Sequence, residues 1–172
     1  MAGLIVVYTG NGKGKTTAAL GLSLRALGHG HNVGFLQFMK GNSDYGEVRI
    51  APTLPNFHLV QCGRADFVSP NNPAALDIAL AEQGIQTIEQ WFSERNFNLI
   101  VLDEILVALT YGLVSLPKVL TLLEKRPPEM DLVLTGRYAP EELIQIADTV
   151  TIMGERRHAY QDGIAAKAGM EF

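Results

Sequence analysis

A glycine-rich stretch, Thr9-Gly10-Asn11-Gly12-Lys13-Gly14-Lys15-Thr16-Thr17, directly follows the apolar run Leu4-Ile5-Val6-Val7-Tyr8. A buried strand that leads into such a loop, and then into Gly-Lys-Thr at the start of a helix, is typical of a phosphate-binding loop. The glycines let backbone N–H groups converge on an anion, and the helix N-terminus adds the positive end of its dipole. We therefore predict that residues 10–17 bind a nucleoside triphosphate, with Lys15 on the outer phosphates and the Thr16 hydroxyl on Mg²⁺.

The loop departs from the usual spacing, in which four residues separate the first glycine from Gly-Lys-Thr. Thr9 stands where that first glycine belongs, and Gly10 leaves only three intervening residues. Lys13 adds a second lysine inside the loop. We therefore expect the triphosphate to bind in a pose that differs from that of an ordinary ATPase.

Composition limits the class of protein. The 172 residues are 47% hydrophobic and 19% charged, which is typical of a globular protein, and they predict one domain spanning residues 1–172. A net charge of -4 argues against a nucleic-acid partner. The single cysteine rules out a disulfide framework and predicts a reducing compartment. The first residues lack a signal peptide, and the most apolar window, 99–114, is too short to span a bilayer. We expect a cytoplasmic protein with no membrane partner.

Apolar runs rich in β-branched residues recur at 4–8, 33–38, 57–61, 99–103, 131–135 and 150–153. They show no polar alternation, which is typical of strands buried on both faces of a parallel sheet. Helices are predicted from the loop to Gly28, from Asn72-Pro73, from Ser115 to just before Pro127, and from Pro140. This alternation predicts a three-layer α/β/α, P-loop NTPase-like (RecA-like) fold with a mainly parallel sheet of about six strands. The tail, residues 154–172, is expected to be irregular.

In such a sheet, ligands bind at the carboxyl ends of the strands. Asp103 and Glu104 end the run at 99–103 and are expected to hold Mg²⁺ opposite Thr16, although Glu104 is equally suited to be a general base. Arg137 follows the next run and is either a phosphate partner or a surface arginine. Arg25, taken by itself, is expected to be structural or solvated.

Two further polar residues, Gln37 at the end of the run at 33–38 and Lys40 just after it, are expected on the same rim, without an assigned role. The four histidines lack the spacing of metal ligands, and we assign none of them a role.

Several motifs together resemble the P-loop ATP:corrinoid adenosyltransferases, which act on cob(I)alamin or cob(I)yrinic acid a,c-diamide. The matching strings are residues 9–17, Gln37-Phe38-Met39-Lys40-Gly41, Gly46-Glu47, Val101-Leu102-Asp103-Glu104, Thr135-Gly136-Arg137, Ala147-Asp148-Thr149-Val150, His158-Ala159-Tyr160, Gly163-Ile164 and Gly169-Met170-Glu171-Phe172. The resemblance covers nearly the whole chain, and the unusual loop is its most specific element.

The resemblance implies a reaction in which a Co(I) corrinoid attacks the 5′-carbon of ATP and the whole triphosphate leaves. In this family ATP lies reversed in the loop, so the shortened spacing is expected. The implied catalytic residues are Lys15, Glu104 and Arg137, with Thr16, Asp103 and Glu104 holding Mg²⁺ and with Lys13 and Arg25 near the phosphates. On this reading Glu104 holds metal and does not activate water.

The resemblance also implies contacts to the corrinoid from the loop after the third expected strand, Gly63-Arg64-Ala65-Asp66-Phe67. Phe67 and Asp66 are the candidates, although better-known members have two aromatic residues here. Some members fold an N-terminal extension over the site. This sequence reaches its first expected strand within a few residues, so closure of the site is expected to come from elsewhere or to be looser. A homodimer and a protein that delivers reductant are further implied partners.

Two other functions remain open at this point. A P-loop ATPase or small-molecule kinase would use Glu104 as a base and release ADP. A nucleotide-responsive module would hand adenosylcobalamin to a client enzyme without turnover of its own. The phosphate product distinguishes all three.

Overall fold

The computed structural model describes residues 2–172 and contains a six-stranded sheet in the order β3-β2-β4-β5-β1-β6. All five strand pairings are parallel. The strands are β1 (Ile5–Thr9), β2 (Val33–Phe38), β3 (Phe57–Cys62), β4 (Leu99–Asp103), β5 (Asp131–Thr135) and β6 (Thr149–Ile152). Each lies within a residue or two of a predicted run, so the predicted parallel sheet is confirmed.

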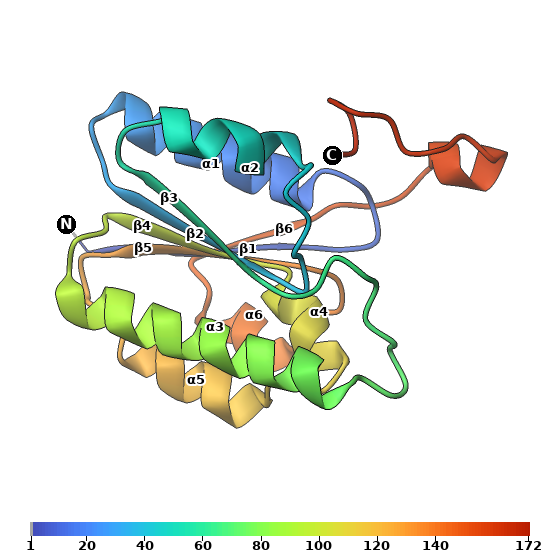
Figure 1. Cartoon of the computed structure of the whole chain (residues 1–172). Coiled ribbons are helices and arrows are strands. Elements are labelled where there is room, and N and C mark those ends of the chain that lie inside the picture. Colours follow the sequence, from blue (N-terminus) through green and yellow to red (C-terminus); the bar gives the residue numbers. More distant parts are fainter. Residues whose placement is uncertain (1) are drawn as a thin grey trace.

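Helices cover both faces of this sheet (Figure 1). One face carries α1 (Lys15–Gly28), α2 (Gly46–Ile50) and the 3₁₀ helix η1 (Ala51–Thr53). The other face carries α3 (Ala75–Glu94), α4 (Ile105–Thr110), α5 (Leu116–Glu124) and α6 (Glu141–Ile146). This three-layer α/β/α, P-loop NTPase-like arrangement confirms the expected fold class. No helix in the described part of the chain has the length and apolar character needed to cross a bilayer.

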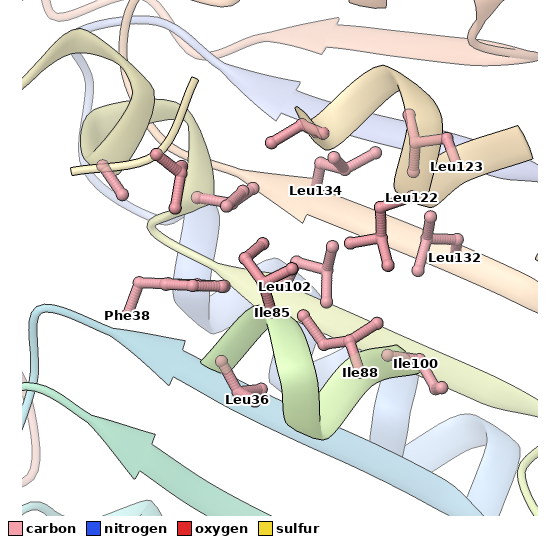
Figure 2. Close-up of a cluster of buried hydrophobic side chains, with 14 of the residues drawn as sticks. Leu36, Phe38, Ile85, Ile88, Ile100, Leu102, Leu122, Leu123, Leu132 and Leu134 are labelled. Atoms are coloured by element: carbon pink, nitrogen blue, oxygen red, sulfur yellow. The ribbon is translucent and has the colours of Figure 1, made fainter. Parts of the chain in front are cut away.

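Strand β4 shows why the strand sequences read as continuous apolar runs. Ile100 and Leu102 lie in the larger core cluster, which includes Ile85 and Ile88 of α3 (Figure 2). Leu99 and Val101 belong to the smaller cluster on the α1 side. Because both faces of the strand are covered, residues 99–102 are all apolar, and the first polar residue is Asp103 at the carboxyl end.

Helix α3 begins later than predicted. Its first residue is Ala75, not Pro73, because Asp77 supplies the cap: its Oδ2 accepts a hydrogen bond from the Ala74 N–H at 2.9 Å. Arg64 donates to both oxygens of Asp77, at 2.7 and 3.2 Å, and lowers the pKa of that carboxyl. The pair therefore also fixes the two ends of the loop at residues 63–74.

The positions of the remaining elements differ from the predicted positions only in detail. α3 passes through Gly84 without a break, and a Cβ there would come within 2.9 Å of the Phe38 ring. The short helices α2 and α4 were not predicted. The tail is irregular as expected, apart from the 3₁₀ helix η2 (Ala159–Asp162), and it returns toward the start of α1 (Figure 1).

Candidate active site

The phosphate-binding loop, residues 10–14, is packed against the chain that leaves β6. The Gly12 N–H donates to the Met153 carbonyl at 2.7 Å, and a Cβ on Gly12 would meet the Gly154 carbonyl oxygen at 2.7 Å. Gly10 and Gly14 have φ values of 101° and 115°, which favour glycine. The glycines therefore allow both the left-handed turns of the loop and its close approach to β6.

Lys15, the first residue of α1, is buried and folded back over this loop. Its Nζ donates to the carbonyl oxygens of Gly10 and Gly12, both at 2.7 Å. Burial, opposed mainly by the charge of Glu104, lowers the pKa of Lys15. The ammonium is thus bound only by neutral carbonyls. A triphosphate is a stronger partner and can replace them.

Asp103, the last residue of β4, is fully buried and lies at the centre of a network of donors. Its Oδ1 accepts hydrogen bonds from the hydroxyls of Thr16, at 2.9 Å, and Thr135, at 2.7 Å. Its Oδ2 accepts from the Lys40 ammonium at 2.7 Å and from the Gln37 amide at 3.4 Å. We call these five residues the Asp103 network. They come from α1, β2, β4, β5 and the segment after β2.

The Asp103 network fits a divalent cation. Thr16 and Asp103 present a hydroxyl and a carboxylate oxygen 2.9 Å apart, the donor types that Mg²⁺ takes from a P-loop protein. A cation already lies beside them, because the Lys40 ammonium contacts Asp103 and is 3.5 Å from the Thr16 hydroxyl. Within residues 2–172 no cluster of three or more His, Cys, Asp or Glu side chains forms a separate metal site. Phosphate and water oxygens would complete the coordination.

Glu104 lies at the turn between β4 and α4. Its φ of 62° places a non-glycine residue in the left-handed region, and its N–H donates to Thr135 Oγ1 at 2.9 Å. Burial first, and then the negative charge of Asp103, raises the pKa of Glu104. Glu104 and Lys15 line the same cavity beside the loop, so the Glu104 side chain lies where a ligand of this loop would bind.

Two adjoining cavities open at the start of α1. The phosphate cavity, about 230 Å³, is lined by residues 11–17 together with Glu104, Arg137, His158, Met170 and Glu171. The α1 cavity, about 520 Å³, is mostly apolar and runs along α1 toward α2; its walls include Leu20, Leu24, Lys40, Tyr45, Glu47 and Phe172. Thr16, Thr17, Met170 and Glu171 line both. One ligand with a charged and an apolar part can therefore span the two.

The end of the tail lines both cavities through Met170 and Glu171. Lys13 pairs with the Glu171 carboxylate and donates to the Met170 carbonyl oxygen at 2.6 Å. The ring of Phe172 lies 6.4 Å from that of Tyr45, measured between centroids. The loop lysine that the sequence singled out thus binds the tail in this state of the protein.

The structure brings most of the predicted phosphate residues together. Arg137, Glu104 and residues 11–17 line one cavity, and Asp103 lies beneath it in contact with Thr16. Arg25 is not among them: it is exposed in the last turn of α1, about 15 Å along the helix from Lys15.

The predicted corrinoid residues lie outside both cavities. Phe67 has an exposed fraction of 101%, and Asp66 is also exposed. Their loop packs against the segment after β2, since a Cβ on Gly63 would meet the Met39 Cα at 2.7 Å. This contact places the Phe67 loop next to the segment that carries Lys40.

Sequence reasoning missed several residues of the site. Lys40 and Gln37 were placed on the rim without a role, and Thr135 was only part of a matching string. His158, which was given no role, lines the phosphate cavity. The position of Lys40, Gln37 and Thr135 at the ends of strands was the one available signal, because strand ends converge on the ligand.

Comparison with known proteins bears on the family of the chain. The family model described as ATP:corrinoid adenosyltransferase BtuR/CobO/CobP matches residues 1–172. The corrinoid adenosyltransferase of Pseudomonas aeruginosa is 39% identical over 99% of this chain and 84% of its own length. The corrinoid adenosyltransferase of Escherichia coli K12 is 33% identical, and corrinoid adenosyltransferase CobA of Salmonella typhimurium is 34% identical; each match covers 99% of this chain and 86% of the relative.

Among solved structures, the flagellar accessory protein FlaH of Methanocaldococcus jannaschii is similar, with a TM-score of 0.58 and 11% identity. The match covers 88% of this chain and 71% of FlaH, and at this identity it shows the fold alone. The family model and the relatives, in contrast, match the chain over essentially its whole length. The chain belongs to the ATP:corrinoid adenosyltransferase family.

Proposed function

We propose that this protein transfers the 5′-deoxyadenosyl group of ATP to the Co(I) centre of a corrinoid and releases tripolyphosphate. The observation that carries the proposal is the pair of adjoining cavities, one charged and one apolar, that share Thr16 and Thr17. The phosphate cavity suits a triphosphate, and the α1 cavity is within the volume range of small-molecule sites. Membership of the adenosyltransferase family supports the same assignment.

The position of the α1 cavity supports a reversed ATP. In an ordinary P-loop enzyme, the terminal phosphates lie beside the metal held by the loop Thr and the strand-end Asp. Here the apolar cavity is on that side, since Thr16 and Lys40 are in its wall. An adenosine in this cavity therefore lies where an ordinary ATPase has its terminal phosphate. The 5′-carbon then faces the rim of the sheet, where a second substrate can reach it.

The chain's own residues stabilise the leaving group. The cobalt donates an electron pair to the 5′-carbon, the Co–C bond forms, and the C5′–O bond breaks with its electrons going to the triphosphate oxygen. Lys15, Lys13 and Arg137 lie around the phosphate cavity and neutralise this charge as it develops. Mg²⁺ held by Thr16 and Asp103, with Glu104 nearby, would add positive charge at the same phosphates. No general base is needed, so alignment of the reactants supplies much of the rate.

The corrinoid would approach from the loop at residues 63–74. Phe67 presents a fully exposed ring there, and Asp66 lies beside it. An exposed aromatic ring suits the flat apolar edge of a corrin macrocycle and the displacement of the lower axial ligand. Gly63, at the start of this loop, packs against Met39 and Lys40, and Lys40 lines the α1 cavity, so one end of the loop adjoins that cavity.

The test is anaerobic incubation of the protein with Mg·ATP and chemically reduced cob(I)alamin. We expect a light-sensitive alkylcobalamin spectrum and one tripolyphosphate for each cobalamin consumed. Formation of ADP and phosphate, with no change in the corrinoid spectrum, would contradict the proposal. Parallel assays with a precursor corrinoid would show which corrinoid is preferred.

A P-loop ATPase or kinase is the second candidate, because Glu104 lies in the phosphate cavity and its pKa is raised toward the range of a general base. Glu104→Gln separates the two roles. A hydrolytic base should lose most of its rate at every Mg²⁺ concentration, whereas a metal ligand should recover rate when Mg²⁺ is raised by roughly tenfold. We expect recovery.

We further propose a homodimer, a reductant protein as partner and a cytoplasmic location, with residues 1–172 forming one domain. The dimer and the reductant rest on the family resemblance, and the location rests on the lone cysteine, Cys62, which is free and buried. Light scattering coupled to size-exclusion chromatography tests the dimer, and a mass of one chain, 18.7 kDa, would contradict it.

A further inference from the structure

Lys40 places a positive charge inside the Asp103 network. Its Nζ is 2.7 Å from Asp103 Oδ2 and 3.5 Å from Thr16 Oγ1, and the side chain is 19% exposed. On the side of the α1 cavity, the Tyr45 ring centroid lies 5.9 Å from Nζ, within range of a cation–π contact. The ammonium therefore lies beside the two protein groups that are expected to hold a divalent cation.

The hydrogen bonds that Asp103 accepts use its acceptor capacity. An ionised carboxylate offers about four acceptor positions. Thr16, Thr135, Lys40 and Gln37 supply four donors to its two oxygens. A divalent cation held between the Thr16 hydroxyl and Asp103 would lie beside the Lys40 ammonium, and the two positive charges would repel each other. An ammonium pushed away from Asp103 would lose its direct carboxylate partner while still partly buried, which costs free energy unless a phosphate replaces that partner.

We propose that Lys40 is an exchangeable counter-ion, which binds Asp103 in the nucleotide-free protein and turns to the triphosphate when ATP and the divalent cation bind together. The inference rests on the proposed use of Mg·ATP, but not on which bond of ATP is broken. Lys40 then makes binding of the cation depend on the nucleotide. By thermodynamic linkage, the nucleotide must in turn bind more tightly when the cation is present.

The geometry allows this exchange. Lys40 ends in a flexible four-carbon stem, and its ammonium is one hydrogen-bond length from Thr16, the residue common to both cavities. The other two lysines of the site are held elsewhere, Lys15 by loop carbonyls and Lys13 by the tail. Lys40 is therefore the lysine whose release is coupled directly to occupation of Asp103.

The experiment measures Mn²⁺ binding by electron paramagnetic resonance, without corrinoid, in the absence and presence of tripolyphosphate. Lys40→Met keeps the apolar stem and removes the charge. We expect it to bind Mn²⁺ alone at least about tenfold more tightly than the unmodified protein, because one like charge beside the cation has gone. Tripolyphosphate should then strengthen Mn²⁺ binding less than it does in the unmodified protein. Lys118→Met is the matched control, since Lys118 pairs with Glu82 on the surface.

Equal Mn²⁺ affinity of the folded Lys40→Met and unmodified proteins would overturn the inference. If Lys40→Met does not fold, Lys40→Arg gives the answer. A guanidinium can pair with Asp103 through two hydrogen bonds and is harder to displace. We expect the Mn²⁺ concentration needed for tripolyphosphate binding to rise severalfold, and an unchanged or lower requirement contradicts the exchange. If the Mn²⁺ measurements come out as expected but the unmodified protein transfers no adenosyl group, only the proposed function is contradicted.

Discussion

The two sides of the site, for which we propose phosphate binding and corrinoid binding, differ in how far the protein fixes its own side chains. On the phosphate side, Asp103 is fully buried, and Lys15 is held by two loop carbonyls. On the corrinoid side, Phe67 is fully exposed at the tip of a loop. Stabilising a departing triphosphate needs charges that are already in place. Contact with a large flat substrate needs apolar surface, which the substrate itself then covers.

The largest effect is expected on the phosphate side, from Lys15→Met. Removing the buried ammonium should lower kcat/KM for ATP by about 10²–10³, the usual loss when a preorganised charge is removed from a transition state. Steady-state adenosylation at saturating corrinoid measures it. Lys118→Met, which removes a surface lysine, should change the value little. A loss within threefold for Lys15→Met would mean that the loop does not hold the leaving group.

Cys62 is the last residue of β3 and stands five residues before Phe67. Burial raises the pKa of this thiol to about 11. At pH 8 the folded protein should therefore react with a thiol reagent more than about a hundredfold more slowly than the unfolded chain, because thiolate is the reactive form. The same shift lowers stability as the pH rises from about 9 to 11, since only the unfolded state then loses the proton. Rapid labelling of the native protein would show that the end of β3 opens along with the loop.

The corrinoid side is tested by Phe67→Ala. Loss of a ring that only the substrate covers should raise the corrinoid KM by roughly tenfold or more, as expected for the burial of a Phe side chain. The urea midpoint and the affinity for ATP should not move, because the ring is exposed in the free protein. Tyr160→Ala removes an exposed ring from η2 and is the control. If Phe67→Ala instead lowers ATP affinity, the two sides are not separable as described.

The smallest effect is expected where the tail meets the phosphate side, from Glu171→Gln. Triphosphate must compete with Glu171 for Lys13, and this ion pair is partly exposed. Removing the carboxylate charge should tighten ATP binding by about two- to threefold, in line with the low free energy of surface ion pairs. Calorimetric titration measures this change. Glu89→Gln, from the surface pair with Lys125, is the control, and weaker ATP binding by Glu171→Gln would show that the carboxylate supports the site.

The same two sides differ in how much the sequence predicts. The sheet and the loop were predictable because burial on both faces and phosphate binding each impose a local pattern, such as the run into Gly12 and Lys15. The predicted start of α3 was wrong, because the cap comes from Asp77, which is held by Arg64 thirteen residues away. Patterns near Asn72 do not contain that information.

The Asp103 network and the tail were beyond local reasoning for a related reason. Lys40 and Thr135 gain their roles from contacts with a residue on a third element. Met170 reaches Lys13 from 157 positions away in the sequence. Such roles depend on tertiary structure and leave only a weak trace, namely a polar residue at the end of a strand.

The proposed reaction breaks the bond of ATP between C5′ and oxygen, and an isotope experiment can follow this bond. ATP carrying ¹⁸O in the bridge between C5′ and the α-phosphorus is incubated anaerobically with the protein, Mg²⁺ and cob(I)alamin, and the phosphate products are analysed by mass spectrometry. If the C5′–O bond breaks, we expect all of the ¹⁸O to be recovered in tripolyphosphate. Recovery of the ¹⁸O in ADP, still bonded to the ribose carbon, would contradict it and establish phosphoryl transfer.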